Sequence, residues 1–230
     1  MIHIDEGNAA ASSPRTTGVL FIAALLLGLA FSLPVPEGAG FLTELAANAA
    51  VVTAGALLMV LAAATSAGIA ISLYPMLKAA HPRLALAAVV FRAIEATFYL
   101  IAIVSLLAVL RLSTAAAQDA ASEAVGATLL NVREEATLIA VLAFSLGALM
   151  YYAAFFRSRL VPRWLSGWGL VAIVLTLMAC GLALLGQRPV TTYALLVLPI
   201  AVQELVLGVW LTIKGIRIGR PFVLPIGAQA

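Results

Sequence analysis

The segment LALAAVVFRAIEATFYLIAIVSLLAVL, residues 84–110, decides the fold. It is longer than the roughly 20 apolar residues that an α-helix needs to cross the hydrocarbon core of a bilayer. Its only charged residues, Arg92 and Glu95, are three positions apart and therefore share one face of such a helix. The segment predicts a membrane-spanning helix that carries a charge pair inside the membrane.

The composition extends this prediction to the whole chain of 230 residues. Hydrophobic residues make up 64% and charged residues 10%, with a mean hydropathy of +1.13. About a quarter of the residues of a soluble domain are charged, so lipid must be the solvent for most of this chain. The net charge of +3 does not indicate a nucleic-acid partner, because the basic residues lie singly or in short clusters beside apolar runs. The expected partner is the lipid bilayer.

Turns that contain proline or charged residues separate the apolar runs, which predict an all-α fold, a six-span transmembrane helical bundle. The expected spans are residues 18–33, 46–77, 84–110, 134–157, 164–185 and 192–213.

The expected domain covers residues 16–217, between cytoplasmic tails at 1–15 and 218–230. Small and polar residues between 113 and 131 predict a loop before the fourth span. Glu134 and Glu135 would then be acids in the first turn of that span, at the outer interface. The first apolar run is short enough to be a signal-peptide core, but a polar stretch precedes it and no clear cleavage site follows.

The distribution of basic residues predicts the orientation, because cytoplasmic loops carry an excess of lysine and arginine. An inside N-terminus gives nine cytoplasmic basic residues against three outside. The cytoplasmic set is Arg15, Lys78, Arg83, Arg157, Arg159, Arg163, Lys214, Arg217 and Arg220; the outer set is Arg111, Arg133 and Arg188. We therefore expect a multi-pass protein of the cell membrane with both termini in the cytoplasm.

Three charged residues lie at membrane depth, where each costs roughly 2.5–3.5 kcal/mol on the lenient insertion scale. With a rise of about 1.5 Å per residue, Arg92 is about 13 Å, Glu95 about 18 Å and Glu204 about 15 Å from the cytoplasmic edge. All three fall in one layer near the middle of the membrane. If the third and sixth spans are neighbours, the guanidinium of Arg92 bridges both carboxylates.

The predicted intramembrane cluster consists of Arg92, Glu95 and Glu204, with Gln203 and Pro199 beside them on the last span. One cation faces two acids, so the surplus carboxylate must be protonated, bound to a cation or reached by water. Pro199 frees the carbonyl of Leu195 and favours a kinked helix. A small molecule or a proton is the ligand that such a site would take.

Three kinds of function remain open. The cluster suits a small transporter or ligand-binding membrane protein, or a structural or regulatory membrane protein in which it only pins helices. A lipid-acting enzyme would have to use carboxylate acid–base chemistry. The sequence contains no catalytic, phosphate-binding or C-x-x-C motif, so we expect no catalytic residues and no cofactor. The lone Cys180 and two histidines outside the apolar runs predict neither a disulfide nor a metal site.

Short motifs in a fixed order resemble a bacterial multi-pass membrane family known as domain of unknown function 4386. They are Arg15–Gly18, Leu73–Pro75, Phe91–Glu95, Phe156–Gly167, and Pro199–Glu204 followed by Trp210–Gly215. The resemblance runs from about Arg15 to Arg217 and implies a bacterial inner-membrane protein without implying an activity. The first apolar run resembles part of the family's domain, which disfavours its interpretation as a signal peptide.

Overall fold

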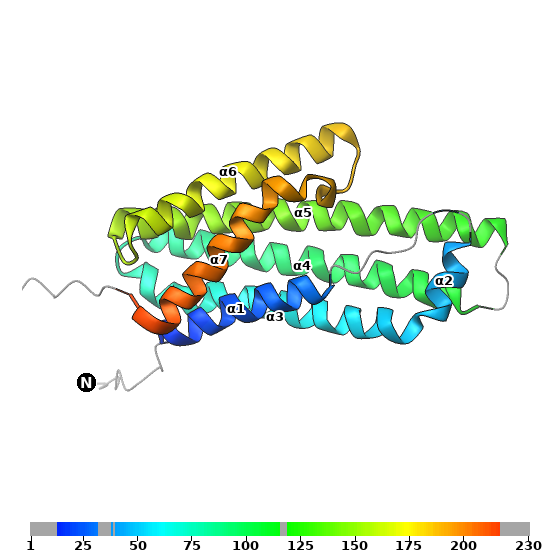
Figure 1. Cartoon of the computed structure of the whole chain (residues 1–230), viewed down its shortest axis with the longest axis horizontal. Helices are drawn as coiled ribbons and strands as arrows, with labels where there is room; N and C mark the ends of the chain where they lie inside the picture. The colour runs from blue at the N-terminus through cyan, green and yellow to red at the C-terminus, as the bar shows by residue number, and fades with distance from the viewer. Residues whose placement is uncertain (1–12, 32–37, 39, 116–118, 217–230) are drawn as a thin grey trace, which may run out of the picture.

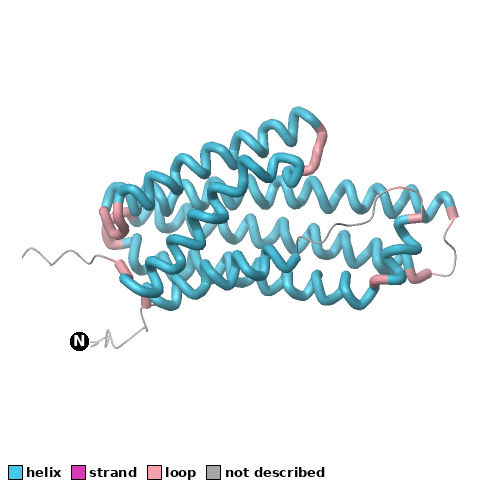
Figure 2. Tube along the Cα trace, in the orientation of Figure 1, coloured by secondary structure: helices cyan, strands magenta, loops and turns pink. Residues whose placement is uncertain are grey.

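The computed structural model describes residues 13–31, 38, 40–115 and 119–216, and all regular structure in these ranges is helical (Figure 2). Figure 1 shows the helices as one elongated bundle. In chain order they are α1 (Pro14–Phe31), α2 (Phe41–Ala47), α3 (Ala49–Lys78), α4 (Pro82–Ser113), α5 (Ala120–Ser158), α6 (Arg163–Gly186), the 3₁₀ helix η1 (Val190–Tyr193) and α7 (Ala194–Lys214).

Five of these helices, α3 to α7, are long and apolar enough to cross a membrane, the last counted together with η1. The chain is therefore a multi-pass all-α membrane protein. Helices suit lipid because their backbone groups bond to one another within a single segment. With 18 residues, or about 27 Å at 1.5 Å per residue, α1 is shorter than these five helices.

The long helices form a closed ring in which each packs against the next one in the chain. The sequence of contacts is α1 with α3, α3 with α4, α4 with α5, α5 with α6, α6 with α7, and α7 back against α1. Within the part of the chain that the structure describes, α4 and α7 do not pack against each other. The predicted contact between the third and sixth spans is therefore made by side chains alone.

Two glycines close the ring where α1 meets α7. A Cβ atom placed on Gly18 would lie 2.5 Å from the carbonyl oxygen of Gly208 and 2.6 Å from the backbone nitrogen of Thr212. Backbone thus lies directly on backbone, which only residues without a side chain allow. On its other side α1 is joined to α3, since the hydroxyl of Thr17 donates to that of Ser72 at 3.0 Å.

The helices differ in length, and this divides the bundle into two regions. With 30, 32 and 39 residues, α3, α4 and α5 are longer than α1, α6 and α7, which have 18, 24 and 21. In Figure 1 all six lie side by side at the end where α1 begins, and α3, α4 and α5 continue alone toward α2. We call the six-helix region the terminal half, and residues 40–55, 105–115 and 119–133 the extension.

The extension has its own small apolar core, in which α2 lies across the long helices. Phe41, Leu42 and Leu45 of α2 are buried against Val109 and Leu110 of α4. The backbone N–H of Gly40 also donates to Glu123 of α5 at 3.0 Å.

The predicted loop between residues 113 and 131 is wrong, because α5 already begins at Ala120. Asp119 caps this helix by accepting a hydrogen bond from the backbone N–H of Ser122 at 2.9 Å, which lowers the pKa of the Asp119 carboxyl. Alanine-rich sequence after such a cap favours a helix even where it is too polar to span a membrane. Glu134 therefore lies inside α5, not in its first turn, and pairs with Arg133 at 2.6 Å.

A buried charge site between four helices

Arg92 is the centre of the polar contacts in the terminal half. Its guanidinium lies on α4 and is almost completely buried. Nη1 donates to the Ser66 hydroxyl on α3 at 2.8 Å and lies 3.2 Å from Oε2 of Glu95. Nη2 donates to the Tyr151 hydroxyl on α5 at 2.9 Å and to Oε1 of Glu204 on α7 at 3.0 Å. A single side chain thus joins four helices, and two of them, α4 and α7, are not packing neighbours.

Glu95 is held from two sides. The Ser66 hydroxyl accepts from Arg92 and donates to Oε2 of Glu95 at 2.9 Å, so Ser66 completes a closed triangle with the ion pair. The Arg92–Glu95 pair itself spans three residues of α4, as their spacing predicts.

Glu204 reaches Arg92 from across the ring. Its Oε1 accepts from both Arg92 and the Tyr151 hydroxyl, the latter at 2.7 Å. The side chain of Glu204 remains 14% exposed, compared with 3% for Arg92 and 4% for Glu95. Glu204 is therefore the most accessible of the three charged groups.

Aromatic rings surround the guanidinium. The centre of the Arg92 guanidinium lies 4.5 Å from the centroid of the Phe144 ring and 5.5 Å from that of Tyr151. Phe21 of α1 approaches Tyr151 edge-on with ring centroids 6.0 Å apart. The stem of Arg92 passes Gly147 of α5, where an added Cβ would lie 3.4 Å from Arg92 Cγ. Cation–π contacts of this kind stabilise a desolvated arginine.

Gln203 belongs to a second, uncharged network and makes none of its described hydrogen bonds with the charged residues. Its Nε2 donates to the carbonyl of Leu165 on α6 at 3.0 Å, and its Oε1 accepts from the Tyr152 hydroxyl on α5. Gly169 of α6 makes room for Tyr152, whose ring would be 2.6 Å from a Cβ at that position. Gln203 therefore joins α7 to α5 and α6.

Pro199 lies within α7, five residues before Glu204. It has no N–H and therefore cannot bond to the carbonyl of Leu195.

The sequence prediction missed Ser66, Tyr151 and Tyr152. Ser66 lies twelve residues before Lys78, which places it about 18 Å into the membrane, at the depth of Glu95. The same depth count applied to hydroxyl groups would have found it. Tyr151 and Tyr152 are consecutive residues of α5, so their side chains point in different directions. Tyr151 bonds to Glu204 in the charged network, and Tyr152 bonds to Gln203 in the uncharged one.

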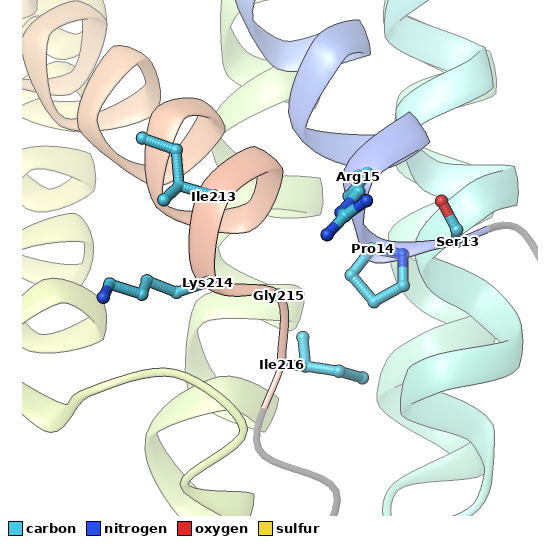
Figure 3. Close-up of a pocket in the computed structure, with 7 residues that line it drawn as sticks. All are labelled: Ser13, Pro14, Arg15, Ile213, Lys214, Gly215 and Ile216. Atoms are coloured by element: carbon cyan, nitrogen blue, oxygen red, sulfur yellow. The ribbon is translucent and has the colours of Figure 1, made fainter.

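A surface pocket of about 420 Å³ lies elsewhere, where the start of α1 meets the end of α7. Ser13, Pro14 and Arg15 line it on one side and residues 213–216 on the other (Figure 3). Figure 3 shows the Lys214 side chain extending away from Arg15, so the two cations do not converge on a common anion. Among the described residues, no three His, Cys, Asp or Glu side chains are grouped to hold a metal ion.

The family model described as Domain of unknown function (DUF4386) matches residues 16–215. This chain belongs to that family. The DUF4386 match confirms the resemblance seen in the sequence, and it includes α1 from Thr16 onward together with every residue of both polar networks. No curated protein and no solved structure matches the chain.

Proposed function

We propose that this protein spans the cell membrane six times, with both termini in the cytoplasm. The place of α1 in the ring, packed on α3 and α7, supports its role as the sixth span. Five helices that each cross once would leave the termini on opposite faces. The described chain ends Ser13 and Ile216 instead line one pocket. The nine-to-three distribution of basic residues supports a cytoplasmic location for this end of the bundle.

We further propose that the protein is a small transporter or ligand-binding membrane protein whose site is the Arg92 network. One observation carries the proposal: a single guanidinium bonds to two carboxylates, Glu95 buried and Glu204 partly buried, so the site lacks one positive charge. Intramembrane acids that are not fully neutralised mark ion and substrate pathways.

Charge movement in a reconstituted bilayer tests this function. The purified protein, in liposomes adsorbed to a solid-supported membrane, would receive concentration jumps of protons, sodium, potassium and choline. We expect at least one of these cations to displace charge, and we expect Glu204→Gln to abolish that response. Glu135→Gln, which removes an exposed carboxylate of α5, is the matched control and should respond like the parent. A response that survives Glu204→Gln, or no response to any of the four cations, would contradict the proposal.

A structural role is the second candidate, and the geometry gives it one specific argument. The bonds of Arg92 connect α3, α4, α5 and α7, and buried polar groups are a known means of fixing helices in lipid. A purely structural network would tolerate replacement of all its charges by neutral side chains of similar size, whereas a ligand site would lose its ligand.

A further inference from the structure

The two carboxylates of the network are bonded in different ways. Both oxygens of Glu95 lie within hydrogen-bond distance of Arg92 Nη1, and Oε2 also accepts from Ser66. On Glu204 the hydrogen bonds between described residues reach Oε1 only, from Arg92 and Tyr151. Oε2 of Glu204 is thus the oxygen that retains capacity for a new partner, on the more accessible side chain.

Within the described part of the chain, no second cation lies at this depth to neutralise Glu204. Besides Arg92 and Glu95, the titratable side chains that interact electrostatically with Glu204 are Tyr99 of α4, and Tyr151 and Tyr152 of α5. Of the two helices packed against α7, α1 carries only Arg15 and α6 only Arg163 as charged residues. Both are at the terminal end of the bundle, as are Lys78 of α3 and Lys214 of α7. Among the described residues nothing supplies the missing positive charge, which points to a source outside the protein.

Packing limits the size of that charge. Arg92, Glu95, Tyr151 and Gln203 are between 0% and 3% exposed, and Phe21 covers Tyr151 from α1. An organic or hydrated inorganic cation needs space beside these closely packed groups. A proton needs none, since it binds to the oxygen itself.

We propose that Glu204 is the proton-carrying group of this protein, loaded and unloaded at Oε2, while Arg92, Glu95 and Ser66 remain a fixed counter-charge. The proposal rests on the proposed function and names the charge that its site takes up. The step balances simply: the carboxylate gains one proton and becomes a carboxylic acid, and Oε1 continues to accept from Tyr151.

Protonation has a mechanical consequence because of where Glu204 lies. The ion pair with Arg92 crosses the ring between two helices that do not otherwise pack together. Neutralising Glu204 removes the attraction between opposite charges and leaves a hydrogen bond in which only Arg92 is charged, so the contact becomes weaker. Proton uptake would thus loosen α7 from α4 and leave Arg92–Glu95 intact.

Infrared difference spectroscopy of the protein in lipid nanodiscs, titrated with pH, tests the proposal. We expect the C=O stretch of a protonated carboxylic acid to disappear as the pH rises, and this band to be absent in Glu204→Gln. Glu95→Gln and the control Glu135→Gln should retain it. Tyr151→Phe keeps the carboxylate but removes its hydroxyl partner, so this variant should keep the band and shift its pH midpoint even if Glu204→Gln does not fold.

The outcomes separate the two proposals. A band that is lost in Glu95→Gln but retained in Glu204→Gln would overturn the assignment, as would the absence of any titrating carboxyl band in the parent. Charge movement driven by sodium, potassium or choline, without such a band, would refute the proton and preserve the proposed function. A band assigned to Glu204 without charge movement in any jump would support the proton and refute the transporter.

Discussion

The terminal half and the extension differ in what joins their helices. In the terminal half, Arg92 bonds to α3, α5 and α7, Gln203 bonds to α6, and Gly18 brings the backbones of α1 and α7 together. In the extension, α2 is held mainly by Phe41, Leu42 and Leu45 buried against aliphatic side chains.

The proposed membrane topology accounts for this difference. Lipid tails are as apolar as leucine, so helices inside a bilayer gain little from burying apolar side chains and instead associate through polar bonds and close contacts. In the proposed six-span topology the terminal half lies at membrane depth, and α2 with the start of α5 lies toward the outer interface, where water makes apolar burial favourable. Polar bonds between helices are thus concentrated in the terminal half, where apolar burial contributes least to helix association.

Removing the central cation should give the largest effect. Arg92→Met leaves Glu95 buried without its partner, which we expect to cost about 3–5 kcal/mol of stability, as for other broken buried pairs. The measurement is the yield and thermal midpoint of the purified protein in detergent. Adding Glu95→Gln and Glu204→Gln to Arg92→Met removes the unpaired charges and should recover most of the folded protein. If this triple variant is as unstable as Arg92→Met alone, charge balance is not what holds the terminal half together.

Disturbing the glycine contact that closes the ring should give the next largest loss of stability. In Gly18→Ala the new Cβ would lie within 2.6 Å of Gly208 and Thr212, so α1 must move away, at an expected cost of about 1–3 kcal/mol. Gly28→Ala in the same helix is the matched control, because a Cβ there meets no atom within 4 Å. Thermal unfolding of both variants checks the prediction, and equal midpoints would show that backbone contact between α1 and α7 is dispensable.

A change in the extension should give the smallest effect and remain local. A Cβ at Gly126 would lie 2.8 Å from Cζ of Phe41, which is at the far end of a side chain and not on the backbone. We expect Gly126→Ala to cost no more than about 1.5 kcal/mol and to speed hydrogen exchange in α2 only. Faster exchange around Arg92 as well would show that the two regions unfold together and would weaken the comparison.

The sequence was sufficient for those features that depend on depth and spacing. Counting residues from basic helix ends placed Arg92, Glu95 and Glu204 in one layer, and the structure brings them into contact. It could not show that α4 and α7 lie on opposite sides of the ring, three positions apart, because the order of helices around a bundle is not a property of any single helix. The sequence also could not show that Gln203 and Glu204 belong to different hydrogen-bond networks, since this depends on which helices each face of α7 contacts.

The error at residues 113–131 has a different cause. Hydropathy reports how far a helix stays in lipid, not where the helix ends, and α5 continues in a polar sequence for more than a turn beyond its apolar part. The N-cap at Asp119 is a local signal that was available in the sequence.

The closed ring also sets an order of assembly. Because neighbours in the chain are neighbours in space, helices can enter the membrane one after another and pack on their predecessor. Arg92 and Glu95 arrive together on α4, so this helix carries its own counter-ion when it first meets lipid. Glu204 is synthesised last, on the helix that completes the ring, and it finds Arg92 and Tyr151 already in place. The surplus acid therefore enters the membrane only when the partners that stabilise it are present.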